Sequence, residues 1–224
     1  MNAEKCCIIS VGCGNWYPQG IERLEKSLNF HGWGGAEFLQ TYLPEGSPSH
    51  AENPYAFKVY AFEQAIQKGF THIVWLDASF WAVKNPMPLF DYIEDNGYFF
   101  FKTGYNLAQS CSDEILTYAK IHRDHAERIN EGATGCIALN FKHEKAKAFF
   151  FRWREYMEAG MFRGSRFHAG QSKDPRFLFH RQDQSAASLV MNELEMIPSE
   201  GGKFEAYYNS DYKGTDNIFF ISGM

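Results

Sequence analysis

The segment at residues 71–81 constrains this chain more than any other, because an unbroken apolar run in it ends abruptly in an acid. Residues 73–76 are apolar, partly β-branched and preceded by the helix-ending pair Lys68-Gly69, which predicts a short strand buried on both faces. Ligands of open α/β sheets bind outside the carboxyl ends of the strands. Asp77, the acid that ends the run, is therefore expected at a ligand-binding edge.

Composition narrows the kind of protein to which this strand belongs. Of the 224 residues, 45% are hydrophobic and 17% are aromatic, which is typical of a packed core and not of a disordered chain. The net charge of −5 excludes a broad basic surface for nucleic acid. The five cysteines form an odd set without metal-finger spacing, so buried, reduced thiols in a cytoplasmic protein are expected. No apolar stretch approaches the ~20 residues of a transmembrane helix, so any membrane association is expected to be peripheral.

Predicted strands and helices alternate, which indicates one α/β domain over residues 1–224 with a mostly parallel central sheet flanked by helices. Asn53 is expected to cap the second helix, with Pro54 in its first turn. The connection at 161–181 is expected to lack regular structure. The predicted strands are at 6–11, 36–43, 73–76, 98–102 and 136–141, and the predicted helices are at 18–30, 54–68, 89–94, 112–128, 143–157 and 183–196.

Three segments with ligand-binding character are expected to meet at one edge of this sheet. Asp77 and Ser79 follow the buried strand, and the small residues 133–135 form a turn. Asp183 and Gln184 open a helix, whose N-terminus offers N–H groups and the positive end of a dipole. A carboxylate at a strand end suits a hard cation or sugar hydroxyls. Each feature alone also has a structural explanation, since Asp183 is a good N-cap and Asp77 could simply end its strand.

Two further positions are open to two interpretations. Lys58, in the first turns of the helix at 54–68, is equally consistent with a solvated lysine and with a lysine near Asp77. The turn after the first strand contains Gly12 and Gly14, which lets backbone approach a ligand, but the same pattern occurs in ordinary tight turns.

The connection at 161–181 is basic although the whole chain is acidic, and Asp174 is its one acid. Connections of this length without regular structure are usually functional or mobile. A cationic loop that faces a ligand and a solvated surface loop are equally supported. Its basic residues and histidines are Arg163, Arg166, His168, Lys173, Arg176, His180 and Arg181.

Three segments resemble, in order and spacing, those of GT-A-fold nucleotide-sugar glycosyltransferases. Residues 74–79, Val-Trp-Leu-Asp-Ala-Ser, followed by 84–90, Lys-Asn-Pro-Met-Pro-Leu-Phe, look like the Asp-x-Asp segment of that family. Residues 132–140 resemble its asparagine-alanine-glycine-valine segment. Residues 180–185 resemble its aspartate-glutamine element before a late helix. The resemblance extends over most of the chain, from position 6 to position 196.

The resemblance implies transfer of a sugar from a UDP- or GDP-sugar donor to a glycan, lipid or protein acceptor. It makes Asp183 and Gln184 the catalytic residues, which take the acceptor proton or lie beside the anomeric carbon, in an inverting or a retaining reaction. It also implies that Asp77 and Ser79 hold a divalent cation, Mn²⁺ or Mg²⁺. The donor-binding residues implied by the resemblance are Gly12, Tyr17, Lys58, Asp77, Ala78, Thr134, Gly135 and Arg181.

The chain departs from the family pattern at the metal. Ser79 stands where a second acid is usual, and a hydroxyl is a weaker ligand for Mg²⁺ or Mn²⁺ than a carboxylate. No histidine follows Gln184, although many metal-dependent members have a late histidine ligand. One explanation, which we favour, is a metal held by Asp77, the donor diphosphate and water. The other is neutralisation of the leaving diphosphate by basic side chains of residues 161–181.

These departures leave a second function open, that of a GT-A-like module that binds a nucleotide or glycan without catalysis. Ser79 and the missing late histidine favour the binding module. The basic connection and the Asp183-Gln184 pair favour the enzyme, because a site that has lost catalysis has no need of them. A nucleotidyltransferase of related fold is less well supported, since residues 12–20 contain no lysine or arginine.

Overall fold

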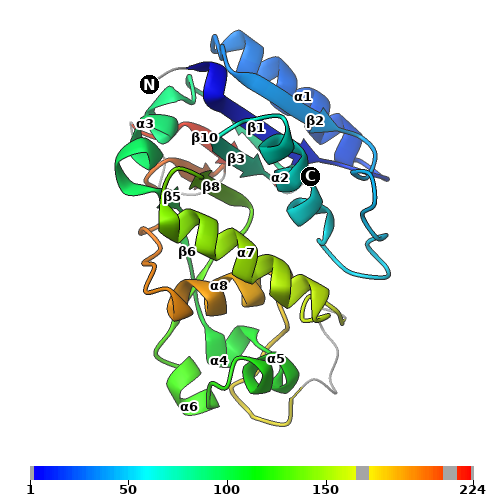
Figure 1. Ribbon diagram of the computed structural model, residues 1–224, viewed down its shortest axis with the longest axis vertical. Helices are drawn as coiled ribbons and strands as arrows, with labels where there is room; N and C mark the ends of the chain where they lie inside the picture. The colour runs from blue at the N-terminus through cyan, green and yellow to red at the C-terminus, as the bar shows by residue number, and fades with distance from the viewer. Residues whose placement is uncertain (1–2, 165–171, 209–215, 223–224) are drawn as a thin grey trace.

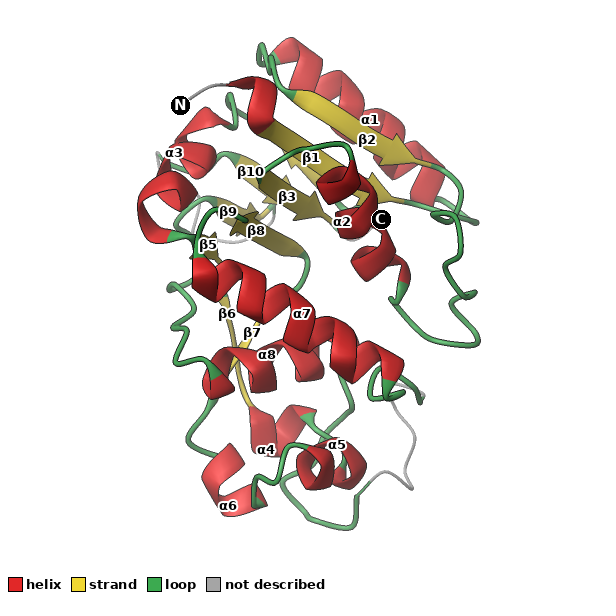
Figure 2. Cartoon of the chain, viewed as in Figure 1, coloured by secondary structure: helices red, strands yellow, loops and turns green. Residues whose placement is uncertain are grey.

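The computed structural model describes residues 3–164, 172–208 and 216–222. At its centre is a five-stranded sheet in the order β2-β1-β3-β8-β5 (Figure 2). β1 pairs in parallel with β2 and β3, and β8 pairs antiparallel with β3 and β5. The expected α/β class is confirmed, with a mixed sheet in which β8 runs against the other four strands. These strands are β1 (Cys6–Val11), β2 (Ala36–Gln40), β3 (His72–Leu76), β5 (Tyr98–Phe99) and β8 (Cys136–Asn140).

Strand β3 is buried on both faces, as its unbroken apolar sequence predicts. All five of its residues are buried. Side chains alternate along a strand, so Ile73 and Trp75 point into one hydrophobic core while Val74 and Leu76 point into another. The sheet is therefore the middle layer of three, and its carboxyl edge lies between two helical layers.

Helices supply the outer layers (Figure 1). α1 and α3 contribute Leu24, Leu28 and Ile93 to the core on the Val74 side. α2 and α7 build the core on the Trp75 side, where the aromatic residues of α7 are buried, as their helical spacing predicts. These helices are α1 (Tyr17–Phe30), α2 (Phe57–Gln67), α3 (Met87–Asn96) and α7 (Glu144–Glu158).

A smaller helical part lies beyond α7 and α8 (Asp183–Glu193), at the lower end of the molecule in Figure 1. The β6–β7 pair connects it to the sheet. The remaining strands, β4, β9 and β10, form a small sheet of their own. The remaining elements are η1 (Ala3–Lys5), β4 (Phe80–Ala82), β6 (Lys102–Asn106), α4 (Leu107–Ser110), α5 (Asp113–Tyr118), α6 (Arg123–Ala126), β7 (Asn130–Gly132), β9 (Glu205–Tyr207) and β10 (Phe219–Ile221).

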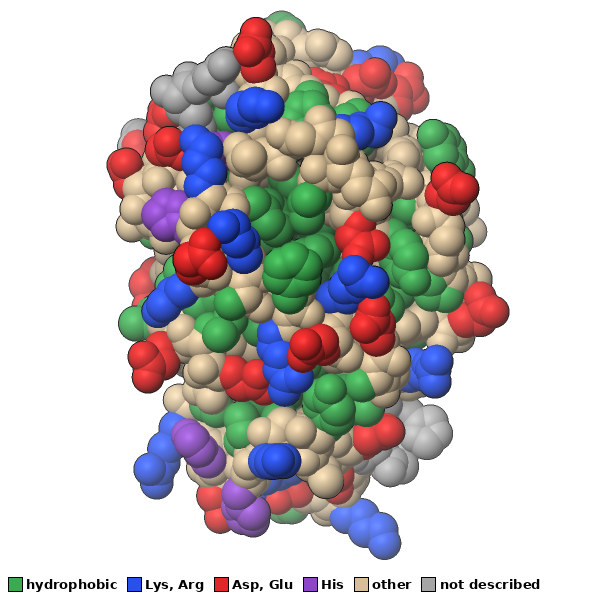
Figure 3. Space-filling model, in the orientation of Figure 1, with side chains coloured by type: hydrophobic (Ala, Val, Ile, Leu, Met, Phe, Trp, Pro, Cys, Tyr) green, Lys and Arg blue, Asp and Glu red, His purple; other side chains and the backbone are tan. Residues whose placement is uncertain are grey.

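The surface agrees with the acidic composition. On the face shown in Figure 3, acidic and basic side chains of the described residues are interspersed and form no continuous basic area. Within the described ranges, no helix combines the length and the apolar character needed to cross a bilayer.

The single helix expected at 112–128 is wrong. Two short helices, α5 and α6, occupy this range instead, because Lys120 has a φ of +56° that ends the first one. The buried Arg123 at the start of α6 donates hydrogen bonds to the carbonyl oxygens of Ala108 and Cys111. The buried guanidinium thus satisfies carbonyl groups at the carboxyl end of α4.

The expected start of the second helix is also wrong. α2 begins at Phe57, because Tyr55 has a φ of +61°, which interrupts a helix. The side-chain amide of Asn53 donates to the carbonyl oxygen of Met157 at 3.2 Å and so is held by α7. The strands expected to end at positions 43 and 102 end earlier, at positions 40 and 99.

Helix α1 lies so close to the turn after β3 that only a glycine fits at the contact. A Cβ atom added at Gly20 would lie 2.2 Å from the carbonyl oxygen of Ala78. One turn later, Arg23 donates to the carbonyl oxygen of Ser79 at 2.9 Å. The position of α1 and the position of the Asp77 turn are therefore coupled through backbone contact.

We expect Gly20→Ala to lower the free energy of unfolding by about 1–3 kcal/mol, the usual cost of overpacking, because α1 or the turn must move. Gly34→Ala is the matched control, since a Cβ there would meet no heavy atom within 4 Å. Urea denaturation of the two variants measures the difference. Equal midpoints for the two variants would contradict the close contact.

Candidate functional site

The acid that ends β3 is fixed by its immediate neighbours. The backbone N–H of Asp77 donates to the carbonyl oxygen of Gly135 at 2.8 Å. The indole N–H of Trp75 donates to Asp77 Oδ1 at 2.8 Å. A Cβ added at Gly135 would lie 3.4 Å from Asp77 Oδ2, so this glycine leaves room beside the second carboxylate oxygen. The Asp77 side chain remains 37% exposed and accessible to a ligand.

Lys58 joins the three segments that were expected to meet. Its ammonium nitrogen lies 3.1 Å from Asp77 Oδ1 and 3.0 Å from Asp183 Oδ2. It also donates a hydrogen bond to the carbonyl oxygen of Thr134 at 3.0 Å. The side chain is 2% exposed, so the alternative of a solvated lysine is wrong. α2 leads into β3 from the opposite direction, which places the start of the helix at the carboxyl edge of the strand.

The charges of this cluster shift one another's protonation. Burial opposes the charge on Lys58, but the carboxylates of Asp183 and Asp77 outweigh it and raise the pKa of Lys58. Burial raises the pKa of Asp183, and the neighbouring Lys58 offsets only part of this rise. Lys58 is thus a permanent cation, and Asp183 is a more basic carboxylate than an ordinary aspartate.

Helix α8 presents its first two side chains to the same place. Asp183 begins the helix, and its carbonyl oxygen accepts the indole N–H of Trp153 at 3.0 Å. Gln184 Oε1 accepts the backbone N–H of Thr134 at 3.1 Å. The side-chain nitrogen of Gln184 is buried and has no hydrogen-bond partner among the described residues. A buried amide nitrogen without a partner is costly, so a bound ligand is a natural acceptor for it.

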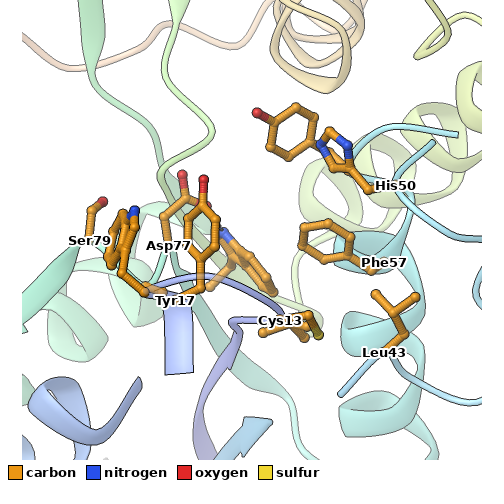
Figure 4. Close-up of a pocket in the computed structure, with 12 residues that line it drawn as sticks. Cys13, Tyr17, Leu43, His50, Phe57, Asp77 and Ser79 are labelled. Carbon is orange, nitrogen blue, oxygen red and sulfur yellow. Dashed lines mark hydrogen bonds between the residues drawn. The ribbon is translucent and has the colours of Figure 1, made fainter. Parts of the chain in front are cut away.

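Two adjoining cavities open at this edge of the sheet. The larger has a volume of about 460 Å³, and in Figure 4 Tyr17 faces Leu43, His50 and Phe57 across it, with Cys13 at its base. The smaller has a volume of about 110 Å³ and is polar. Tyr55 and Asp77 line both cavities and so form their common boundary. The larger cavity is lined by Val11, Cys13, Trp16, Tyr17, Leu43, His50, Tyr55, Phe57, Trp75, Asp77, Ala78 and Ser79, and the smaller by Tyr55, Lys58, Asp77, Thr134, Arg181, Gln182, Asp183 and Gln184.

The structure gathers most of the predicted site residues at these two cavities. Tyr17, Ala78 and Ser79 line the larger one, while Thr134, Arg181 and the catalytic candidates line the smaller one. Gly12 lies under the start of α1, where an added Cβ would be 2.7 Å from the carbonyl oxygen of Tyr17.

Much of the aromatic wall was missed from the sequence. Trp16, His50, Tyr55 and Phe57 lie in loops or in the first residue of a helix, and no motif distinguishes them. The high aromatic content was the one available signal, and it does not say which rings line a cavity. Trp16 and Tyr17 stack at a centroid distance of 4.4 Å, which makes one flat wall.

The basic residues at 161–181 do not act as one group. Arg176 pairs with Asp174, Asp124 and Glu127, so its charge is already neutralised within the protein. Arg163 and Lys173 are exposed. Arg181 is the basic residue of this connection that lines the smaller cavity, within the ranges described. Arg166 and His168 lie outside the described residues.

No family model and no curated protein sequence matches the chain. Among solved structures, one similar chain is a glycosyltransferase involved in the glycosylation of the major capsid of PBCV-1, with a TM-score of 0.51. The chain therefore shares its fold with a glycosyltransferase. The match covers 96% of this chain and 91% of that chain at 15% sequence identity, so the glycosyltransferase likeness concerns the arrangement of elements and transfers no residue role.

His180, which precedes the site residue Arg181, is a buried neutral histidine. It is 1% exposed, and burial lowers its pKa to about 4. Its ring nitrogen Nδ1 has no hydrogen-bond partner among the described residues.

This burial predicts acid sensitivity. An unfolded chain takes up a proton at the ordinary histidine pKa of about 6.5, whereas folded His180 resists protonation down to about pH 4. The stability contribution is therefore complete above about pH 6.5 and is lost as pH falls toward 4, by about 3 kcal/mol in total. His180→Gln should flatten this part of the stability–pH curve, and His125→Gln, at an exposed histidine, should leave it unchanged. Urea denaturation at a series of pH values measures both, and an unaltered slope in His180→Gln would be the contrary result.

Proposed function

We propose that the protein is a glycosyltransferase that moves a sugar from a nucleotide-diphosphate sugar to a glycan, lipid or protein acceptor. The pair of adjoining cavities carries this proposal. The larger, aromatic cavity suits a flat base and its ribose, and its volume of about 460 Å³ falls within the range of small-molecule sites, roughly 300–1,000 Å³. The smaller polar cavity suits a sugar, whose hydroxyls need carboxylate and amide partners. Asp77 stands at the boundary, where the diphosphate would lie.

The cluster around Lys58 fits the chemistry of sugar transfer. The acceptor oxygen forms a bond to the anomeric carbon, the bond from that carbon to the diphosphate breaks, and the acceptor loses a proton. In an inverting reaction Asp183, with its raised pKa, takes that proton. In a retaining reaction Asp183 or Gln184 stabilises the positive charge that develops at the anomeric carbon.

A binding test addresses the donor first. UDP-, GDP- and CMP-sugars are screened by thermal shift, and we expect stabilisation by UDP- or GDP-sugars, followed by slow donor hydrolysis. Tyr17→Ala should weaken binding of the stabilising nucleotide about tenfold, because a stacking surface is lost. Phe30→Ala is the matched control, since Phe30 ends the same helix and is 84% exposed. Calorimetry measures the affinities. Equal affinities for the two variants would show that the nucleotide base does not bind in the larger cavity.

Turnover tests the catalytic assignment. Asp77→Asn and Asp183→Asn should each reduce donor hydrolysis and transfer by at least about a hundredfold while the protein stays folded. Asp91→Asn, at an exposed aspartate, should retain full activity. Full activity in Asp77→Asn or Asp183→Asn would contradict the role assigned to that residue in turnover. Nucleotide binding by the wild type without hydrolysis or transfer would instead support the binding module that Ser79 favours.

A further inference from the structure

The smaller cavity already contains a cation. The ammonium of Lys58 has three oxygens around it, at 3.1 Å from Asp77, 3.0 Å from Asp183 and 3.0 Å from the Thr134 carbonyl. The ammonium donates a hydrogen bond to the Thr134 carbonyl, and the two carboxylate oxygens lie at ion-pair distance from it. The side chains of Lys58 and Asp183 are 2% and 4% exposed, so water competes little for these interactions.

These residues fit a divalent metal poorly. Asp77 Oδ1 is already held by Lys58 and by the indole of Trp75, which leaves Oδ2 as its one uncommitted oxygen. The described residues contain no group of three or more His, Cys, Asp or Glu side chains that could hold a metal ion, so a metal here would depend on the carboxylates of Asp77 and Asp183 and on water. A divalent cation on Asp77 would also stand next to the positive charge of Lys58 and be repelled by it.

We propose that Lys58 fills the place that the family resemblance gives to a divalent metal, so that nucleotide binding at this site does not depend on a metal. Lys58 is then a positioning residue, which fixes the carboxylates of Asp77 and Asp183 from the protein side. This inference rests on the proposed function, because it concerns the same donor site. In this proposal the cause of weak metal binding is the charge of Lys58. The alternative cause is the lack of a second acid at Ser79.

Calorimetry of UDP and GDP binding to the wild-type protein tests the proposal directly. Affinity for whichever nucleotide binds should be the same in EDTA and in excess Mn²⁺, within about threefold. A larger loss of affinity in EDTA overturns the proposal. If neither nucleotide binds in either condition, the proposed function fails, and the measurement of Mn²⁺ itself then decides the role of Lys58.

That measurement follows the free Mn²⁺ signal by electron paramagnetic resonance without any nucleotide. The wild type should leave Mn²⁺ free. Depletion of the free-ion signal by the wild type would overturn the proposal, whatever the outcome with nucleotides.

Two variants separate Lys58 from the missing acid. Ser79→Asp restores the Asp-x-Asp pattern and keeps Lys58, so it should still leave Mn²⁺ free, and binding of Mn²⁺ by this variant overturns the proposal. Lys58→Met frees both carboxylates and should bind Mn²⁺, whereas Lys68→Met, at an exposed lysine that caps the same helix, should not. A folded Lys58→Met protein that leaves Mn²⁺ free also overturns it. If Lys58→Met does not fold, Ser79→Asp still gives the answer.

Discussion

The ion pairs of Lys58 are the constraint on which the site depends. They join helix α2, the end of strand β3 and the start of helix α8, which lie far apart in the sequence. A buried ammonium is stable only when its carboxylates are in place, since an unpaired buried charge costs several kcal/mol. The placement of α2 and α8 on the sheet is therefore fixed at the carboxyl edge of β3, where the two cavities meet.

Local sequence patterns predict most of the fold. The apolar run of β3, the spacing of apolar residues in α1 and α7, and the alternation of strands and helices predict an α/β domain, and the structure confirms it. The errors lie where a tertiary contact overrides local preference. Asn53 and Pro54 look like a helix start, yet Asn53 is held by α7. Arg123 is charged and would be expected on a surface, yet it is buried against carbonyl groups at the end of α4, and the expected long helix is broken near it.

The site was predictable where it lies at the ends of regular elements. Asp77 follows from the rule that ligands bind at the carboxyl ends of strands. Asp183 follows from its place at the start of a helix, where N–H groups and the positive end of the dipole face a ligand. The structure brings both to one ammonium. The aromatic wall was not predictable, because Trp16, His50 and Tyr55 reach the cavity through loop conformation. Charge in the sequence was a poor guide as well. Arg176 belongs to a basic stretch, but three acids neutralise it in space.

The shape of the smaller cavity depends on two residues with a strained backbone conformation. Tyr55 and Gln182 both line it, and both have positive φ values, +61° and +53°. Each such residue costs on the order of 1–3 kcal/mol in local strain. Glycine at either position would relax the backbone, but it would remove the Tyr55 ring that lies 5.1 Å from the Lys58 ammonium or the Gln182 amide that donates to Gly164. The side-chain contacts of Tyr55 and Gln182 therefore hold the cavity in shape against the local strain of its backbone.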